Sequence, residues 1–183
     1  MPRTVLAVPL LALLLTGCSG DSATPGSSGA TRSSDASAAP EVRAGLAALY
    51  AGDRPGEEDT RNGECFADAL LDRVSTAELE EAGVVVGGQV AATSPELEPD
   101  LAETWVDAMF SCMDFVEESA RAQVAFTKGA VDWREYAACL RAELDEDAVR
   151  AAVVGMLSGD WRTPEVAALT DAQAECSAQA DPR

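Results

Sequence analysis

The chain has 183 residues and a mass of 19.0 kDa, which is enough for one compact domain with accessory segments. It carries 32 acidic and 13 basic residues, a formal net charge of −19, and no histidine. The lack of histidine excludes Ser-His-Asp and Cys-His catalysis and imidazole-based metal sites, and the negative charge argues against nucleic acid as a partner, which would require a basic surface.

The amino-terminal residues have the pattern of an export signal. Arg3 precedes an apolar stretch at residues 5–15, VLAVPLLALLL. A helix that spans a bilayer needs about 20 apolar residues, whereas the apolar part of a secretory signal peptide has about 7–15. We therefore expect residues 1–17 to be a signal peptide rather than a membrane span.

The end of this stretch carries a lipidation motif. Leu15-Thr16-Gly17-Cys18 resembles the lipobox of bacterial lipoproteins, in which an aliphatic residue and two small residues precede a cysteine. The resemblance implies cleavage before Cys18, a thioether-linked diacylglyceryl group with acyl chains such as palmitate, and an anchor on the extracytoplasmic face of the cell membrane. Two acyl chains anchor a protein stably. The alternative is an ordinary signal peptide in which Cys18 is incidental.

A flexible linker is expected next, over residues 18–40. Residues 19–40 are almost all Ser, Ala, Gly, Thr or Pro and include no large apolar side chain. Such a segment cannot offset its ordering entropy by burial. It would hold the following domain clear of the membrane surface.

The rest of the chain, residues 41–183, is expected to form an acidic all-α domain. Apolar residues recur at helical spacing, and the one β-branched run, Val84-Val85-Val86, has glycines on both sides. About six or seven short helices are expected from the periodicity and the caps. They lie at 41–51, at about 62–74, after a Ser75–Glu78 capping box, from Pro99 to about Phe126, after Asp132, at 146–157 after Asp145 or Asp147, and after Thr163-Pro164.

Four cysteines follow Cys18, and an even number in an exported chain predicts two disulfides. They are Cys65, Cys112, Cys139 and Cys176. Three pairings are possible on paper. A loose internal repeat, in which each half runs from a Cys-x4-Leu helix through a capped helix to a helix with Cys near its end, favours Cys65–Cys112 and Cys139–Cys176. It also indicates a degenerate two-fold repeat. A zinc site or redox pair is disfavoured, because the chain has no CxxC motif.

Several polar groups are candidates for chemistry. Clusters of acidic residues could bind calcium, although the spacing around Gly63 does not fit an EF-hand and a solvated acidic surface is the simpler interpretation. Glu64, Glu103 and Glu135 lie near apolar or aromatic neighbours, where a carboxylate pair could hydrolyse a glycan. The single lysine, Lys128, has no Ser-x-x-Lys motif before it, so a serine nucleophile activated by lysine is not expected.

Two tripeptides around tryptophan are also notable. Asp132-Trp133-Arg134 recurs as Asp160-Trp161-Arg162, and Trp105 is the third tryptophan. An exposed Trp beside an Arg could stack on a sugar or anchor a partner. The structural interpretation is that Asp caps a helix, Trp packs and Arg lies over it.

These features predict a lipid-anchored protein of the cell envelope. The Ala-rich composition and the preference for Arg over Lys resemble those of small uncharacterised secreted lipoproteins of actinobacteria. We expect a non-catalytic binding or structural module without a cofactor, acting on an envelope protein or another ligand. The alternative is a carboxylate-dependent hydrolase of wall glycan, and a third possibility is a calcium-dependent structural module.

Overall fold

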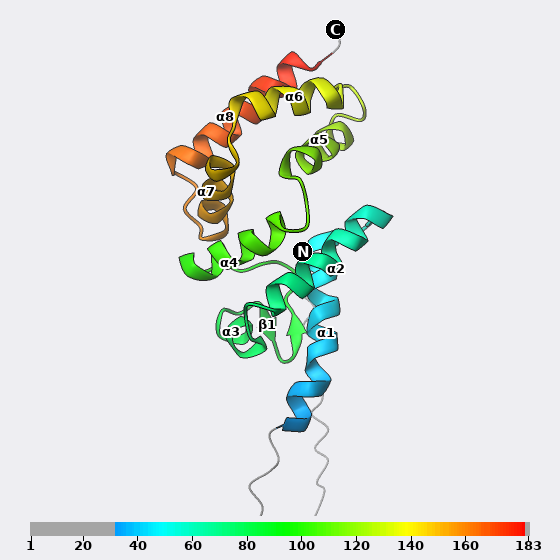
Figure 1. Ribbon diagram of the computed structural model, residues 1–183, viewed down its shortest axis with the longest axis vertical. Helices are drawn as coiled ribbons and strands as arrows, with labels where there is room; N and C mark the ends of the chain where they lie inside the picture. Colours follow the sequence, from blue (N-terminus) through cyan, green and yellow to red (C-terminus); the bar gives the residue numbers. More distant parts are fainter. Residues whose placement is uncertain (1–31, 182–183) are drawn as a thin grey trace, which may run out of the picture. The chain divides into compact units, whose positions relative to one another are not determined.

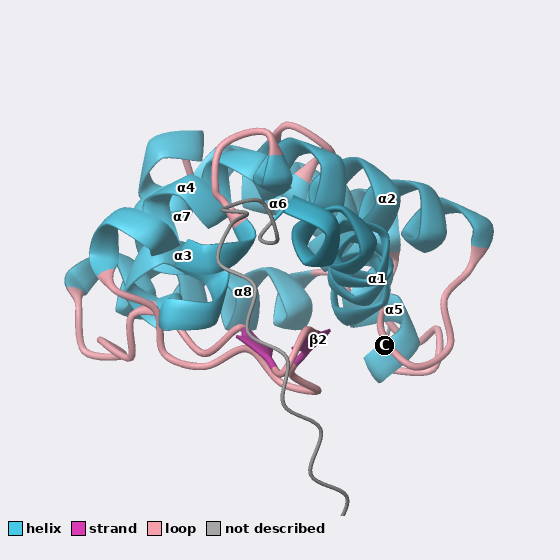
Figure 2. Ribbon diagram, turned by 90° about the horizontal axis from the view of Figure 1, so that it is seen from below, coloured by secondary structure: helices cyan, strands magenta, loops and turns pink. Residues whose placement is uncertain are grey.

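A computed structural model describes residues 32–181, with side chains from Pro40 onward. The described part is built from eight α-helices and one short hairpin, which confirms the all-α prediction (Figures 1 and 2). The elements are α1 (Arg32–Ala51), α2 (Glu57–Leu71), α3 (Thr76–Glu81), β1 (Val85–Val86), β2 (Gln89–Val90), α4 (Pro99–Phe110), α5 (Phe115–Phe126), α6 (Trp133–Glu143), α7 (Glu146–Leu157) and α8 (Pro164–Gln179). None of these helices is long and apolar enough to cross a bilayer. The predicted signal peptide and Cys18 lie outside the described residues.

The first helix begins earlier than the sequence predicts. α1 starts at Arg32 rather than at residue 41, so it includes the end of the expected linker and has Pro40 inside it. Val42 and Leu46 are fully buried and hold the helix in place. The alanines that precede Pro40 have the highest helix propensity of any residue, so the packed helix extends toward the amino terminus.

The helix expected from Pro99 to Phe126 is divided in two, so the described part has eight helices rather than the expected six or seven. α4 ends at Phe110, and α5 begins after Asp114. The Asp114 carboxylate accepts a 3.0 Å hydrogen bond from the backbone N–H of Glu117, which is the geometry of a helix N-cap. Cys112 lies in the connection between the two helices.

The predicted caps at other helix starts are confirmed. Ser75 and Glu78 form a reciprocal capping box at α3, and the Thr163 hydroxyl accepts from Val166 N–H ahead of Pro164 at α8. Asp132 caps α6 and Asp145 caps α7. These contacts join residues two or three positions apart, which explains why they can be recognised in the sequence.

The β-branched run forms half of a minimal hairpin. β1 pairs with β2 in antiparallel register through Gly87-Gly88, whose φ angles are 61° and 79°. Positive φ at both turn residues is the requirement of a type I′ turn, and glycine meets it without steric cost.

The two disulfides have the pairing favoured from the sequence. Cys65 on α2 bonds Cys112 just after α4, and Cys139 on α6 bonds Cys176 on α8. α1 packs against α2 in the first half, as α5 packs against α6 in the second. Each half therefore has four helices. In each half, the second helix packs against the first, and a disulfide joins the second helix to the end of the fourth.

The largest side chains of the first buried cluster include Phe66, Leu70 and Leu46, and those of a second include Tyr136 and Leu140. A further cluster, Val106 with Val149 and Val153, joins α4 to α7 across the two halves. α4 contacts α7, and the backbone N–H of Leu97 donates a 2.8 Å hydrogen bond to the carbonyl of Leu157. As the low aromatic content predicts, most of the other buried side chains are Leu, Val and Ala.

Candidate functional site

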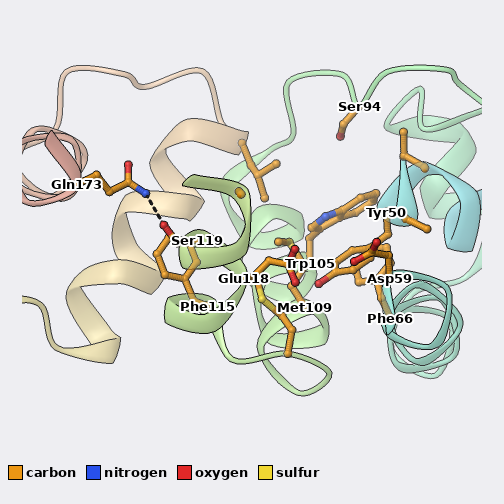
Figure 3. Close-up of a pocket in the computed structure, with 15 residues that line it drawn as sticks. Tyr50, Asp59, Phe66, Ser94, Trp105, Met109, Phe115, Glu118, Ser119 and Gln173 are labelled. Carbon is orange, nitrogen blue, oxygen red and sulfur yellow. Dashed lines mark hydrogen bonds between the residues drawn. The ribbon is translucent and has the colours of Figure 1, made fainter. Parts of the chain in front are cut away.

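A cavity of about 670 Å³ lies among the described residues. Its lining comes from both halves, chiefly from α1, α2, α4 and α5 (Figure 3). Ligand sites in proteins are concave, mostly apolar and carry a few polar groups. The lining residues are Leu49, Tyr50, Ala51, Asp59, Phe66, Ser94, Trp105, Met109, Met113, Phe115, Glu118, Ser119, Ala122, Leu157 and Gln173.

Three aromatic rings form one wall of the cavity. Phe66 stacks on Tyr50 with 5.1 Å between ring centroids and meets Trp105 at 5.0 Å in a tilted arrangement. Phe66 is fully buried and Trp105 is 5% exposed, whereas Tyr50 is only partly buried. Because Cys65 on α2 is bonded to Cys112 after α4, the disulfide ties together the helices that carry Phe66 and Trp105.

The opposite side is held by a chain of hydrogen bonds. Gln173 on α8 donates a 3.2 Å hydrogen bond to the hydroxyl of Ser119 on α5, as Figure 3 shows. The Ser119 hydroxyl also lies 3.3 Å from that of Tyr136 on α6. One turn further along α5, the side-chain amide of Gln123 donates a 2.5 Å hydrogen bond to the hydroxyl of Ser177 on α8. These bonds hold the α5 wall of the cavity against α6 and α8.

Two carboxylates complete the lining, and both contact one arginine. Arg121 on α5 lies 3.4 Å from Asp59, 2.8 Å from Glu58 and in direct contact with Glu118. The second oxygen of Asp59 accepts a 2.8 Å hydrogen bond from the backbone N–H of Gly56. Three carboxylates share one guanidinium, so the cluster keeps an excess of negative charge.

The hydroxyl of Tyr50 lies in this negative field. Its pKa is raised to about 12, chiefly by burial and also by the charges of Glu118 and Asp59, while the charge of Arg121 opposes the increase. The neutral phenol is thus favoured over the phenolate. At neutral pH, Tyr50 presents a hydrogen-bond donor and an uncharged ring to the cavity.

The acids singled out from the sequence lie elsewhere. Glu64, Glu103 and Glu135 are exposed on α2, α4 and α6, and none of them lines this cavity. The structure instead brings together Asp59 and Glu118, which the sequence presents only as members of acidic clusters. No local signal separates these two from their neighbours, because α2 and α5 meet only in the folded chain.

The tryptophans have different environments. Trp105 lines the cavity, whereas Trp133 is 47% exposed and Trp161 is 63% exposed. Asp132 caps α6, and the guanidinium of Arg134 lies 5.6 Å from the Trp133 ring centroid. The expectation that Asp caps and Arg covers the ring is confirmed at this tripeptide. Both of these tryptophans are exposed, since Trp133 begins α6 and Trp161 precedes α8 at the surface.

The described side chains form no metal centre: within residues 40–181, no three or more Cys, Asp or Glu side chains gather in a way that could hold a metal ion. The sulfur atoms of Cys65, Cys112, Cys139 and Cys176 are bonded in pairs. They are therefore not available as zinc thiolates in this state.

No protein-family model matches the chain, and neither the curated proteins nor the solved structures contain a significant match.

Proposed function

We propose that this protein is a lipid-anchored protein of the cell envelope whose helical domain binds a small ligand in the cavity between α1, α2, α4 and α5. The aromatic wall of this cavity carries the proposal. Aromatic and thioether side chains favour an apolar ligand body, and a few polar groups would orient it. The lipobox motif that ends at Cys18 supports the anchor and the location.

Binding rather than catalysis fits the polar groups of the cavity. The hydroxyl of Ser119 accepts a hydrogen bond from the amide of Gln173, and an amide is not a general base. The carboxylates of Asp59 and Glu118 both form ion pairs with Arg121. Ligand retention needs neither an activated nucleophile nor a proton donor.

The anchor is tested by Cys18→Ser, with Ser19→Ala as the neighbouring control. In cells of the source organism fed an alkyne analogue of palmitate, we expect the wild type and Ser19→Ala to be labelled and to sediment with membranes. Cys18→Ser should lose both properties, because its hydroxyl does not form the thioether. An unlabelled wild-type chain that keeps its first methionine would contradict the proposal.

The ligand site is tested by placing a bulky side chain in the lining of the cavity. Ala122 on α5 lines the cavity and is exposed, whereas Ala125 on the same helix is exposed but is not part of the lining. N-phenyl-1-naphthylamine, a neutral dye that fluoresces in apolar sites, should bind the wild type and Ala125→Trp alike. Ala122→Trp should weaken binding at least about tenfold, because the indole would occupy ligand space.

Circular dichroism would verify that both tryptophan variants fold. Equal dye affinity for the two variants would show that the dye binds elsewhere. That result, or a wild type that does not bind the dye, would overturn the assignment of this cavity as the ligand site.

A further inference from the structure

We infer that the ligand of the cavity is an organic ammonium ion with an apolar body. This inference rests on the proposed ligand site and adds the chemical class of its occupant. It depends on the charges that line the cavity, on the acceptor capacity of one carboxylate, and on the aromatic wall.

The charge of the lining has one sign. Among the described residues that line the cavity, the charged ones are Asp59 and Glu118, and both are acidic. An anionic ligand would therefore meet repulsion and no compensating base. Arg121 is not part of the lining and already contacts three carboxylates, including that of Glu58, so this cluster keeps an excess of two negative charges.

The two acids are also partly withdrawn from water. The side chain of Asp59 is 33% exposed and that of Glu118 is 36% exposed. A charge in such a position is less screened by solvent than one on the open surface. The net charge of the chain, −19, adds a field that attracts cations toward the cavity.

Glu118 has acceptor capacity to spare. A carboxylate can accept about four hydrogen bonds, and the contact of Glu118 with Arg121 uses one oxygen, Oε2. Asp59 is more fully occupied, because one oxygen faces Arg121 and the other accepts from Gly56 N–H. Glu118 is thus the better placed of the two to accept a bond from an ammonium group.

The aromatic wall complements a cation with an apolar body. Ring faces carry negative electrostatic potential and attract ammonium groups, and Trp is the strongest such group. Tyr50 and Trp105 flank Phe66 in the stack, and Met109 and Met113 supply flexible thioethers. One pocket therefore offers π faces and apolar contacts to the body and carboxylate oxygens to the charge.

Three probes with one body test this inference: 4-phenylbutylammonium, 4-phenylbutanol and 4-phenylbutanoate. Their affinities for the full mature protein would be measured by displacement of N-phenyl-1-naphthylamine and by calorimetry. We expect the ammonium to bind about tenfold more tightly than the alcohol, and the carboxylate to bind most weakly.

Charge variants locate the effect. Glu118→Gln should remove most of the preference for the ammonium over the alcohol while leaving the affinity for the alcohol unchanged. Glu117→Gln is the matched control: it removes the same charge one residue away, outside the lining, and should leave the preference within about twofold of that of the wild type. Asp59→Asn is a second variant that removes a charge from the lining. Melting curves would report any loss of stability if the hydrogen bond from the backbone N–H of Gly56 were weakened.

The outcomes separate the two claims. Equal binding of the ammonium and the alcohol, with loss of both in Ala122→Trp, would overturn this inference and leave the ligand site in place. An equal effect of Glu117→Gln and Glu118→Gln would also overturn it, since the preference would then come from the overall charge. Failure of all three probes to bind at millimolar concentration would overturn the inference and the proposed site together.

Discussion

Replacing Cys65 and Cys112 together by alanine is expected to lower the free energy of unfolding by about 4 kcal/mol. The two cysteines are 47 positions apart. A cross-link over such a loop lowers the conformational entropy of the unfolded chain, and this loss corresponds to about 4 kcal/mol of stability at 25 °C. Small domains have a total stability of about 5–15 kcal/mol. The variant would therefore lose a large part of what keeps it folded.

The second disulfide provides the comparison. Cys139 and Cys176 are 37 positions apart, and because the entropy depends on the logarithm of loop length, its removal should also cost about 4 kcal/mol. Urea unfolding of the two double-alanine variants measures both values. Losses below about 1 kcal/mol for both would show that the unfolded chain is already constrained in another way.

The two disulfides should differ in their effect on the cavity. The Cys65–Cys112 bond ties α2, with Phe66, to the end of α4, with Trp105. The Cys139–Cys176 bond joins α6 and α8 in the second core. At low temperature, where both variants remain folded, dye affinity should fall when Cys65 and Cys112 are replaced and should change little when the other pair is replaced.

Phe66→Ala is expected to cost about 3–5 kcal/mol in the free energy of unfolding. The ring is fully buried between Tyr50 and Trp105, with centroids 5.1 Å and 5.0 Å away. Its removal loses the transfer free energy of the side chain and leaves a cavity that its neighbours fill only in part. Dye binding should weaken as well, because Tyr50 would lose the ring on which it stacks.

Phe126→Ala is the matched control for this change. It removes the same atoms from a ring that is 83% exposed at the end of α5. An exposed ring loses little on truncation, so the cost should stay within about 0.5 kcal/mol. Urea unfolding of both variants gives the comparison, and a similar cost at both positions would contradict the burial of Phe66.

Much of the secondary structure could be predicted from the sequence because it depends on neighbouring residues. The Ser75–Glu78 box, the Asp145 cap and the Thr163-Pro164 start are contacts within one helical turn. The disulfide pairing could be inferred too, because the repeat places equivalent cysteines at equivalent points of its two halves. The sequence does not indicate the break before Asp114, because Asp also occurs inside helices, as Asp107 does in α4.

The candidate site depended on the tertiary structure. The sequence by itself determined a helical, disulfide-bonded and strongly acidic domain, because helix periodicity, caps and cysteine parity act over short distances or are set by composition. Only the folded chain decided that Asp59 and Glu118, among many acids, share one cavity, and that Trp105 rather than Trp133 or Trp161 lines it. The physical reason is that a cavity forms where helices remote in sequence pack together, so its lining is set by contacts that local patterns do not record.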